Sequence, residues 1–234
     1  MRARNPVAIL ILAGMIFPSN ARALSTLDFW IPQGRTLVPG ELKFDIEQRM
    51  TVDKSGGAYH RGLWGFGYGL FQWGRFTTEI GLDWREPTFT TGAAALAAHA
   101  RLVFNNVVED GWAIGVGIDQ LGFHPGQNDY NVNHLVFHNL IGEEWEMAFG
   151  GFSGNSTFLA GDDKGMFVGL WTLIQSGHGR AGVEWMSGNS EFGYFVPGLK
   201  VEIREGVMGY LAYGFANRKN FVKDWLLLRV SILF

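Results

Sequence analysis

The residues best suited to do chemistry in this sequence are acids, bases and histidines set singly into apolar stretches. Carboxylates and imidazoles in such surroundings can transfer protons, hold a metal ion or pair with one another. Seven basic, six acidic and three histidine residues form this candidate set: Arg75, Glu79, Asp83, Arg85, His99, Arg101, Asp119, His134, His138, Glu146, Arg180, Glu184, Lys200, Glu202, Arg204 and Arg229.

The spacing of these residues matches neither a catalytic nor a metal-binding motif. His134 and His138 are four residues apart, which along a strand is roughly 13 Å and too far for both to bind one ion. The chain has no Cys, so thiolate ligands, cysteine nucleophiles and disulfides are excluded. We therefore expect no catalytic residue, no metal site and no cofactor.

The segments that carry the candidate residues alternate apolar and polar side chains with a period of two. In residues 75–85, Leu82 and Trp84 lie on one face, and Glu79 and Asp83 lie on the other. This alternation predicts a β-strand rather than a helix. Twelve such segments follow one another, joined alternately by short and long polar connections. One merged or missed hairpin would change the number to ten or fourteen.

Tryptophans gather near the ends of the predicted strands. Trp73 lies at a short connection, Phe71–Gly74, whereas Trp64 and Trp225 lie near long connections. Indole rings are amphipathic and settle at membrane–water interfaces. Two aromatic girdles are therefore expected, one at each end of the strands.

The start of the chain is typical of a secretory signal peptide. Arg2 and Arg4 precede the apolar run Val7–Phe17, and Ala21-Arg22-Ala23 supplies small residues for cleavage. We expect residues 1–23 to be removed on export. The formal net charge of −3 implies no basic surface for nucleic acid. After residue 20 no apolar window reaches the ~18 residues that a membrane-spanning helix needs.

Taken together, these features resemble a Gram-negative outer-membrane β-barrel of the porin or channel-like class. The most specific element is the last strand, Leu226–Phe234, because its final Phe234 resembles the C-terminal signal that the barrel assembly machinery reads. The resemblance implies an all-β fold: a transmembrane, antiparallel up-and-down barrel over residues 41–234. Residues 24–40 would lie in the periplasm or in the lumen. The implied location is the bacterial outer membrane, with its lipid and the assembly machinery as partners, and the oligomeric state stays open.

The candidate residues acquire a role from this fold. In lipid every backbone polar group must be paired, so strands cross only as a closed barrel with apolar side chains outward. The sixteen residues are then expected to line a pore. Its expected constriction is formed by Lys200, Glu202 and Arg204 together with Arg180 and Glu184.

A narrow passive pore for small hydrophilic solutes or ions is the function we expect from such a lumen. Two alternatives stay open. One is a non-conducting structural or anchoring barrel whose loops bind a partner. The other is an outer-membrane hydrolase, although the sequence lacks the His-x-Ser pair that outer-membrane phospholipases carry.

Overall fold

The computed structural model describes residues 31–32, 34–52, 60–85, 95–107, 111–123, 131–142, 144–159, 161–174, 178–190, 192–218 and 223–234. The predicted signal peptide lies outside these ranges. The described residues form one short helix, α2 (Ser156–Leu159), and twelve strands. The strands are β1 (Leu42–Thr51), β2 (His60–Trp73), β3 (Phe76–Arg85), β4 (Ala95–Phe104), β5 (Ala113–Gly122), β6 (Val132–Ile141), β7 (Trp145–Gly154), β8 (Lys164–Leu173), β9 (Gly179–Met186), β10 (Tyr194–Arg204), β11 (Val207–Ala216) and β12 (Trp225–Leu233). Within the described ranges, no helix has the length and apolar character needed to cross a membrane.

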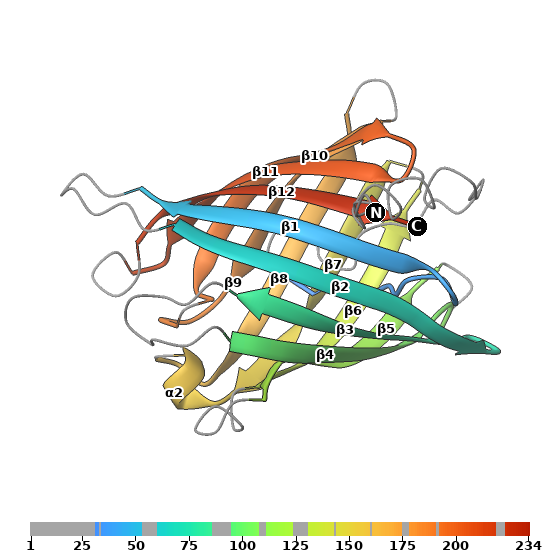
Figure 1. Ribbon diagram of the computed structural model, residues 1–234, viewed down its shortest axis with the longest axis horizontal. Helices are drawn as coiled ribbons and strands as arrows, with labels where there is room; N and C mark the ends of the chain where they lie inside the picture. Colours follow the sequence, from blue (N-terminus) through green and yellow to red (C-terminus); the bar gives the residue numbers. More distant parts are fainter. Residues whose placement is uncertain are drawn as a thin grey trace, which may run out of the picture.

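The twelve strands close into a single antiparallel barrel (Figure 1). Each strand pairs with its neighbours in the chain, and β1 pairs with β12 to complete the ring. This seam sets Glu47 opposite Arg229 and Phe44 opposite Ile232. Closure pairs the backbone groups of every strand, as a bilayer requires. The predicted fold class and the predicted number of strands are confirmed.

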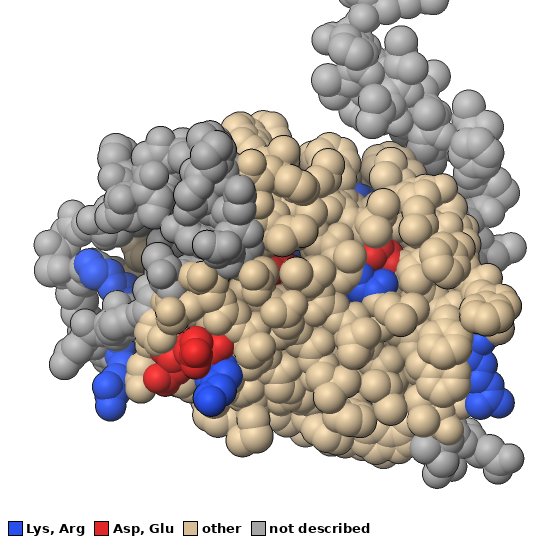
Figure 2. All heavy atoms as spheres, turned by 90° about the horizontal axis from the view of Figure 1, so that it is seen from below, with Lys and Arg blue, Asp and Glu red and all other residues tan. Residues whose placement is uncertain are grey.

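Alternation along each strand separates an apolar outer face from a polar inner face. On β3, Ile80 and Leu82 are more than two-fifths exposed, whereas Glu79, the residue before Ile80, is fully buried. The outer surface seen in Figure 2 is accordingly a broad uncharged belt in which few charged atoms appear. Such a belt is the surface that lipid covers, and the polar face is left to line the interior.

Most of the described tryptophans at strand ends project outward, as the aromatic girdles require. Trp73 is highly exposed beside the β2–β3 turn, and Trp64 packs edge-on against Trp84 at 5.0 Å on the outer face. Trp225 does not follow the prediction, because only 4% of its surface is exposed. Its ring packs inside the barrel against Tyr194, at 5.3 Å between centroids.

The β2–β3 hairpin is longer than the sequence pattern predicts. The expected connection Phe71–Gly74 is mostly strand, since β2 runs on to Trp73 and the turn is made by Gly74 and Arg75. Gly74 has a φ of 59°, which glycine adopts at little cost. A register shift between Gly69 and Phe71 interrupts the alternation there, and this irregularity hides the strand from a period-two pattern.

Candidate functional site

The candidate site is the interior of the barrel, where inward-facing charges are buried in pairs and short networks. The largest network runs over β3 to β6 and is centred on Glu79 and His99. The ring nitrogens of His99 lie 3.2 Å from Asp83 Oδ2 and 3.5 Å from Glu79 Oε1. Arg101 lies on β4 directly opposite Glu79 and comes within 3.8 Å of it.

The same network continues across β5 to β6. The Nη2 atom of Arg101 lies 3.0 Å from Asp119 Oδ1, and the second oxygen of Asp119 lies 3.1 Å from His134 Nδ1. Acid and base therefore alternate from Asp83 to His134 along the wall. Buried charges are tolerated only when they are paired in this way.

A second network lies on β6, β7 and β9. Glu146 is fully buried, and its two oxygens contact His138, at 2.6 Å, and Arg180. Glu184 and Lys200 are also almost fully buried, at 1% and 2% exposure. The Lys200 ammonium lies 5.7 Å from the centre of the Tyr210 ring, within the range of a cation–π contact.

The seam between β1 and β12 carries a third network, most of which our sequence analysis missed. Glu47 accepts two hydrogen bonds from Arg229, at 2.6 and 2.9 Å, and contacts Arg49 at 2.5 Å. Lys43 and Asp45 form a further pair at 3.0 Å. Only Arg229 belongs to the candidate set. The signal for the others was present, because residues 43, 45, 47 and 49 share the period-two pattern of the candidate residues.

Three candidate residues lie apart from these buried networks. Arg75 lies exposed in the β2–β3 turn, where it donates to the Asn106 carbonyl at 2.7 Å. Glu202 and Arg204 are exposed at the end of β10, beside a register shift. The expected constriction is therefore not gathered as one cluster: Arg180, Glu184 and Lys200 are inside, without Glu202 and Arg204. The side chain of Arg85 lies outside the described residues.

Residues 31–32 and 34–40, which we call the lumen segment, lead from the inside of the barrel to the start of β1 (Figure 1), and the last three of them are exposed. Ile31 and Leu37 are buried, with at most 1% of their surface exposed. The Ile31 N–H donates to Glu184 on β9 at 2.8 Å, and the Leu37 N–H donates to Glu79 on β3 at 3.0 Å. Because β3 and β9 are six strands apart in a ring of twelve, the segment connects opposite walls.

Glycines make room for the lumen segment on the wall. A Cβ at Gly67 would lie 3.2 Å from Leu37, and one at Gly169 would lie 2.6 Å from Ile31. The backbone of Val38 passes directly over Gly69. The segment thus occupies space that the side chains of the wall leave unfilled.

Outside the lumen segment, Glu41 is the ionisable residue where the chain enters the wall. Its carboxylate accepts a hydrogen bond from the Val38 N–H at 3.0 Å. Burial nevertheless raises the pKa of Glu41 above its ordinary value, and the nearby charge of Glu79 adds to the rise. The surroundings of Glu41 at the mouth of the barrel therefore disfavour its ionised form.

Metal binding has no visible support in the described part of the chain. No group of three or more His, Asp or Glu side chains there is arranged to hold a metal ion. The networks above are chains of acid–base pairs, in which each carboxylate faces a cation or an N–H donor. These networks therefore act through ion pairs, hydrogen bonds and contacts with water.

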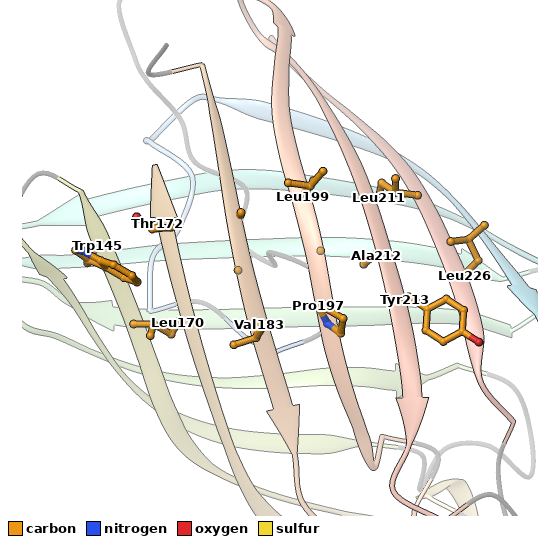
Figure 3. A pocket seen from close by; sticks show the side chains of 13 residues that line it. Trp145, Leu170, Thr172, Val183, Pro197, Leu199, Leu211, Ala212, Tyr213 and Leu226 are labelled. Atoms are coloured by element: carbon orange, nitrogen blue, oxygen red, sulfur yellow. The ribbon is translucent and has the colours of Figure 1, made fainter. Parts of the chain in front are cut away.

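The outer surface has one hollow of about 640 Å³ over β7 to β12 (Figure 3). Small residues such as Ala181 and larger ones such as Leu170 and Tyr213 line it. Its lining is apolar and lies on the lipid-facing side. We assign no chemistry to this hollow.

Comparison with known proteins identifies the fold. No protein-family model and no curated protein sequence matches the chain. Among solved structures, it is similar to an outer membrane channel from Pseudomonas putida F1, with a TM-score of 0.53, 13% identity and coverage of 85% of this chain and 97% of that chain. It is also similar to the outer membrane protein Omp33 from Acinetobacter baumannii, with a TM-score of 0.50, 8% identity and coverage of 84% and 99%.

An outer membrane phospholipase from Salmonella typhi matches at a TM-score of 0.49 and 8% identity, over 96% of each chain. At these identities the likeness concerns the fold and not the activity. The fold is that of the outer-membrane β-barrels, and the apolar outer belt of this chain is the surface that lipid covers in such a barrel.

Proposed function

We propose that this protein is a narrow outer-membrane channel for small hydrophilic solutes or ions, which the lumen segment closes reversibly. One observation carries the proposal: the lumen segment rests on wall glycines, among them Gly67 and Gly169. A barrel that needs only a filled interior can fill it with side chains of its own wall, as small barrels do. Here a separate piece of chain fills the space, so its withdrawal would leave a path between polar walls.

The contacts that hold the segment are suited to reversible closure. Two single hydrogen bonds to carboxylates hold its backbone inside the barrel, from Ile31 to Glu184 and from Leu37 to Glu79. A third bond, from the Gly40 N–H to the Gly69 carbonyl at 2.8 Å, lies at the end next to β1. The segment adds no strand to the barrel, whose ring is complete without it. Its withdrawal therefore needs no break in the wall.

A cysteine pair that locks the lumen segment to the wall tests the proposal. The chain has no cysteine of its own. The Leu37 Cδ1 atom lies 3.2 Å from the position of a Cβ at Gly67, so the two side chains face each other, and disulfide formation in the Leu37→Cys/Gly67→Cys pair is verified before recording. Single-channel conductance is measured on protein purified from outer membranes and inserted into planar bilayers.

We expect stable conductance steps from the unmodified chain, none from the oxidised pair, and their return on reduction. The single variants Leu37→Cys and Gly67→Cys are the controls and conduct under both conditions. Normal conductance through a fully oxidised pair would refute closure by the segment. Silence of the unmodified chain and of the reduced pair would refute the channel itself.

A non-conducting structural barrel is the second candidate, and burial of the lumen charges favours it. Glu79, Glu146 and Lys200 are nearly inaccessible to water in this structure. A barrel built only for anchoring would keep these pairs closed. The same recordings decide between the two, because this candidate gives no steps in any redox state.

A further inference from the structure

The lumen segment contacts the wall as a positively charged ligand would. It presents two backbone N–H donors, from Ile31 and Leu37, to carboxylates at 2.8 and 3.0 Å. It also brings Arg35, which interacts electrostatically with a third carboxylate, Glu146. All three contacts offer hydrogen or positive charge to buried oxygen atoms.

The bases of the lumen are engaged by other wall residues. Arg101 is held by Asp119 at 3.0 Å, and Arg229 is held by Glu47 at 2.6 Å. These pairs do not involve the lumen segment, so they persist when it leaves. The groups that lose a partner on its withdrawal are therefore acceptors, chiefly Glu79 and Glu184.

Glu79 has a second acceptor oxygen, which the lumen segment does not use. Its Oε1 atom is fully buried and accepts no hydrogen bond from any described residue. Its nearest charged neighbours are His99, at 3.5 Å, and Arg101, at 3.8 Å. A buried carboxylate oxygen in this state gains free energy from any N–H donor that reaches it.

We propose that Glu79, Glu146 and Glu184 form a site made of separate binding positions on different walls of the lumen, each for cationic solutes rich in N–H groups, such as amines and guanidinium compounds. The lumen segment occupies this site in the closed channel and competes with the solute for the same oxygens. As a statement about which solutes cross, this inference rests on the proposed channel function. Carboxylates prefer such solutes because charge-assisted N–H···O bonds are the stronger class of hydrogen bond.

Competition for the site is measured without relying on conductance. A maleimide labels the Leu37→Cys variant only when the segment leaves its buried position, so the labelling rate reports withdrawal. A solute that binds only when the segment has left raises the rate by a factor of 1 + [L]/Kd, so methylguanidinium at about four times its Kd is expected to raise it about fivefold. Tetramethylammonium, which has no N–H donor, is expected to leave the rate unchanged.

Two further variants localise the effect. Leu37→Cys/Glu79→Gln is expected to lose the acceleration, and so is Leu37→Cys/Glu184→Gln, so that misfolding of one still leaves a test. Leu37→Cys/Glu202→Gln, changed at an exposed glutamate, is expected to keep it. Acceleration that is absent, equal with tetramethylammonium, or retained in both lumen variants would overturn the site.

Reversal potentials separate this inference from the proposed function. In a salt gradient we expect conductance steps that prefer cations, with a preference about fivefold weaker in Glu184→Gln. Steps that prefer anions would overturn the solute class and leave the channel intact. An absence of steps would instead overturn the channel, while the labelling result would still decide whether the site exists.

Discussion

Glu184→Gln should raise the fraction of time that the channel is open about fivefold. In the structure Glu184 is 1% exposed and accepts the Ile31 N–H at 2.8 Å. A hydrogen bond to a charged group contributes about 1.5–3 kcal/mol, and a neutral one about 0.5–1.5 kcal/mol. Glutamine keeps an acceptor oxygen, so the change removes about 1 kcal/mol from the closed state, which is about fivefold in population.

A change of this size matters because the closed state is nearly balanced against the open one. Burial of Ile31 and Leu37, with their two charge-assisted hydrogen bonds, contributes about 6–12 kcal/mol. Fixing the backbone of the seven described residues in this range, 31–32 and 34–38, costs about 7–14 kcal/mol. The two terms cancel to within a few kcal/mol, so about 1 kcal/mol redistributes the states measurably.

Single-channel recording at fixed voltage gives the open fraction directly. Glu202→Gln is the matched control, because this glutamate is exposed at the end of β10 and makes no described contact with the lumen segment. An open fraction of Glu184→Gln that equals or falls below that of the unmodified chain would refute the reasoning. The hydrogen bond to Ile31 would then not hold the segment in place.

Four further predictions concern the barrel itself. Leu82→Arg, on the lipid face, should lower the free energy of unfolding by about 2–4 kcal/mol at midplane depth, measured by denaturant titration in lipid vesicles. Glu47→Ala should lower the free energy of unfolding by about 3–5 kcal/mol, because it removes the carboxylate that pairs with the buried Arg229. The double change Glu47→Leu/Arg229→Met should lower it much less in the same titration. Phe234→Ala should reduce the yield of assembled barrel in membrane fractions, and an unchanged yield would remove its role as an assembly signal. Glu41→Gln should stabilise the barrel at neutral pH, because the raised pKa of Glu41 means that the folded state favours the uncharged carboxyl. This advantage should vanish below about pH 4.5, where Glu41 is protonated in both the folded and the unfolded state. Thermal unfolding measured across pH tests this prediction.

The alternation of side chains made most of the barrel predictable. Glu79 and Leu82 fall on opposite faces of β3 because each step along a strand reverses the side-chain direction. The same rule applies to Trp225, which shares the parity of Arg229 and is therefore inward. The expectation of an interfacial ring there gave more weight to residue type than to position.

Other features depend on contacts between distant parts of the chain and are not visible in local patterns. The lumen segment shows neither the helical nor the strand periodicity of apolar residues. Its place is fixed by Glu184, which is more than 150 residues away in the sequence. The exposure of Glu202 follows from where β10 extends past the pairing with β9, which ends at Val201, and shifts register against β11. Both features are set by the whole ring. Such positions are decided by closure of the barrel rather than by their own sequence.

The seam between β1 and β12 also orders events in time. It joins Glu47 to Arg229 across 182 positions, so it can form only after nearly all of the chain has been delivered. Contacts between residues so distant in sequence are slow to form. Until then, the barrel is an open sheet with two unpaired edges, and the ion pair between Glu47 and Arg229 is not yet formed. Because the lumen segment leads directly into β1, closing the last seam also encloses the segment, so the proposed channel would be completed in its shut state.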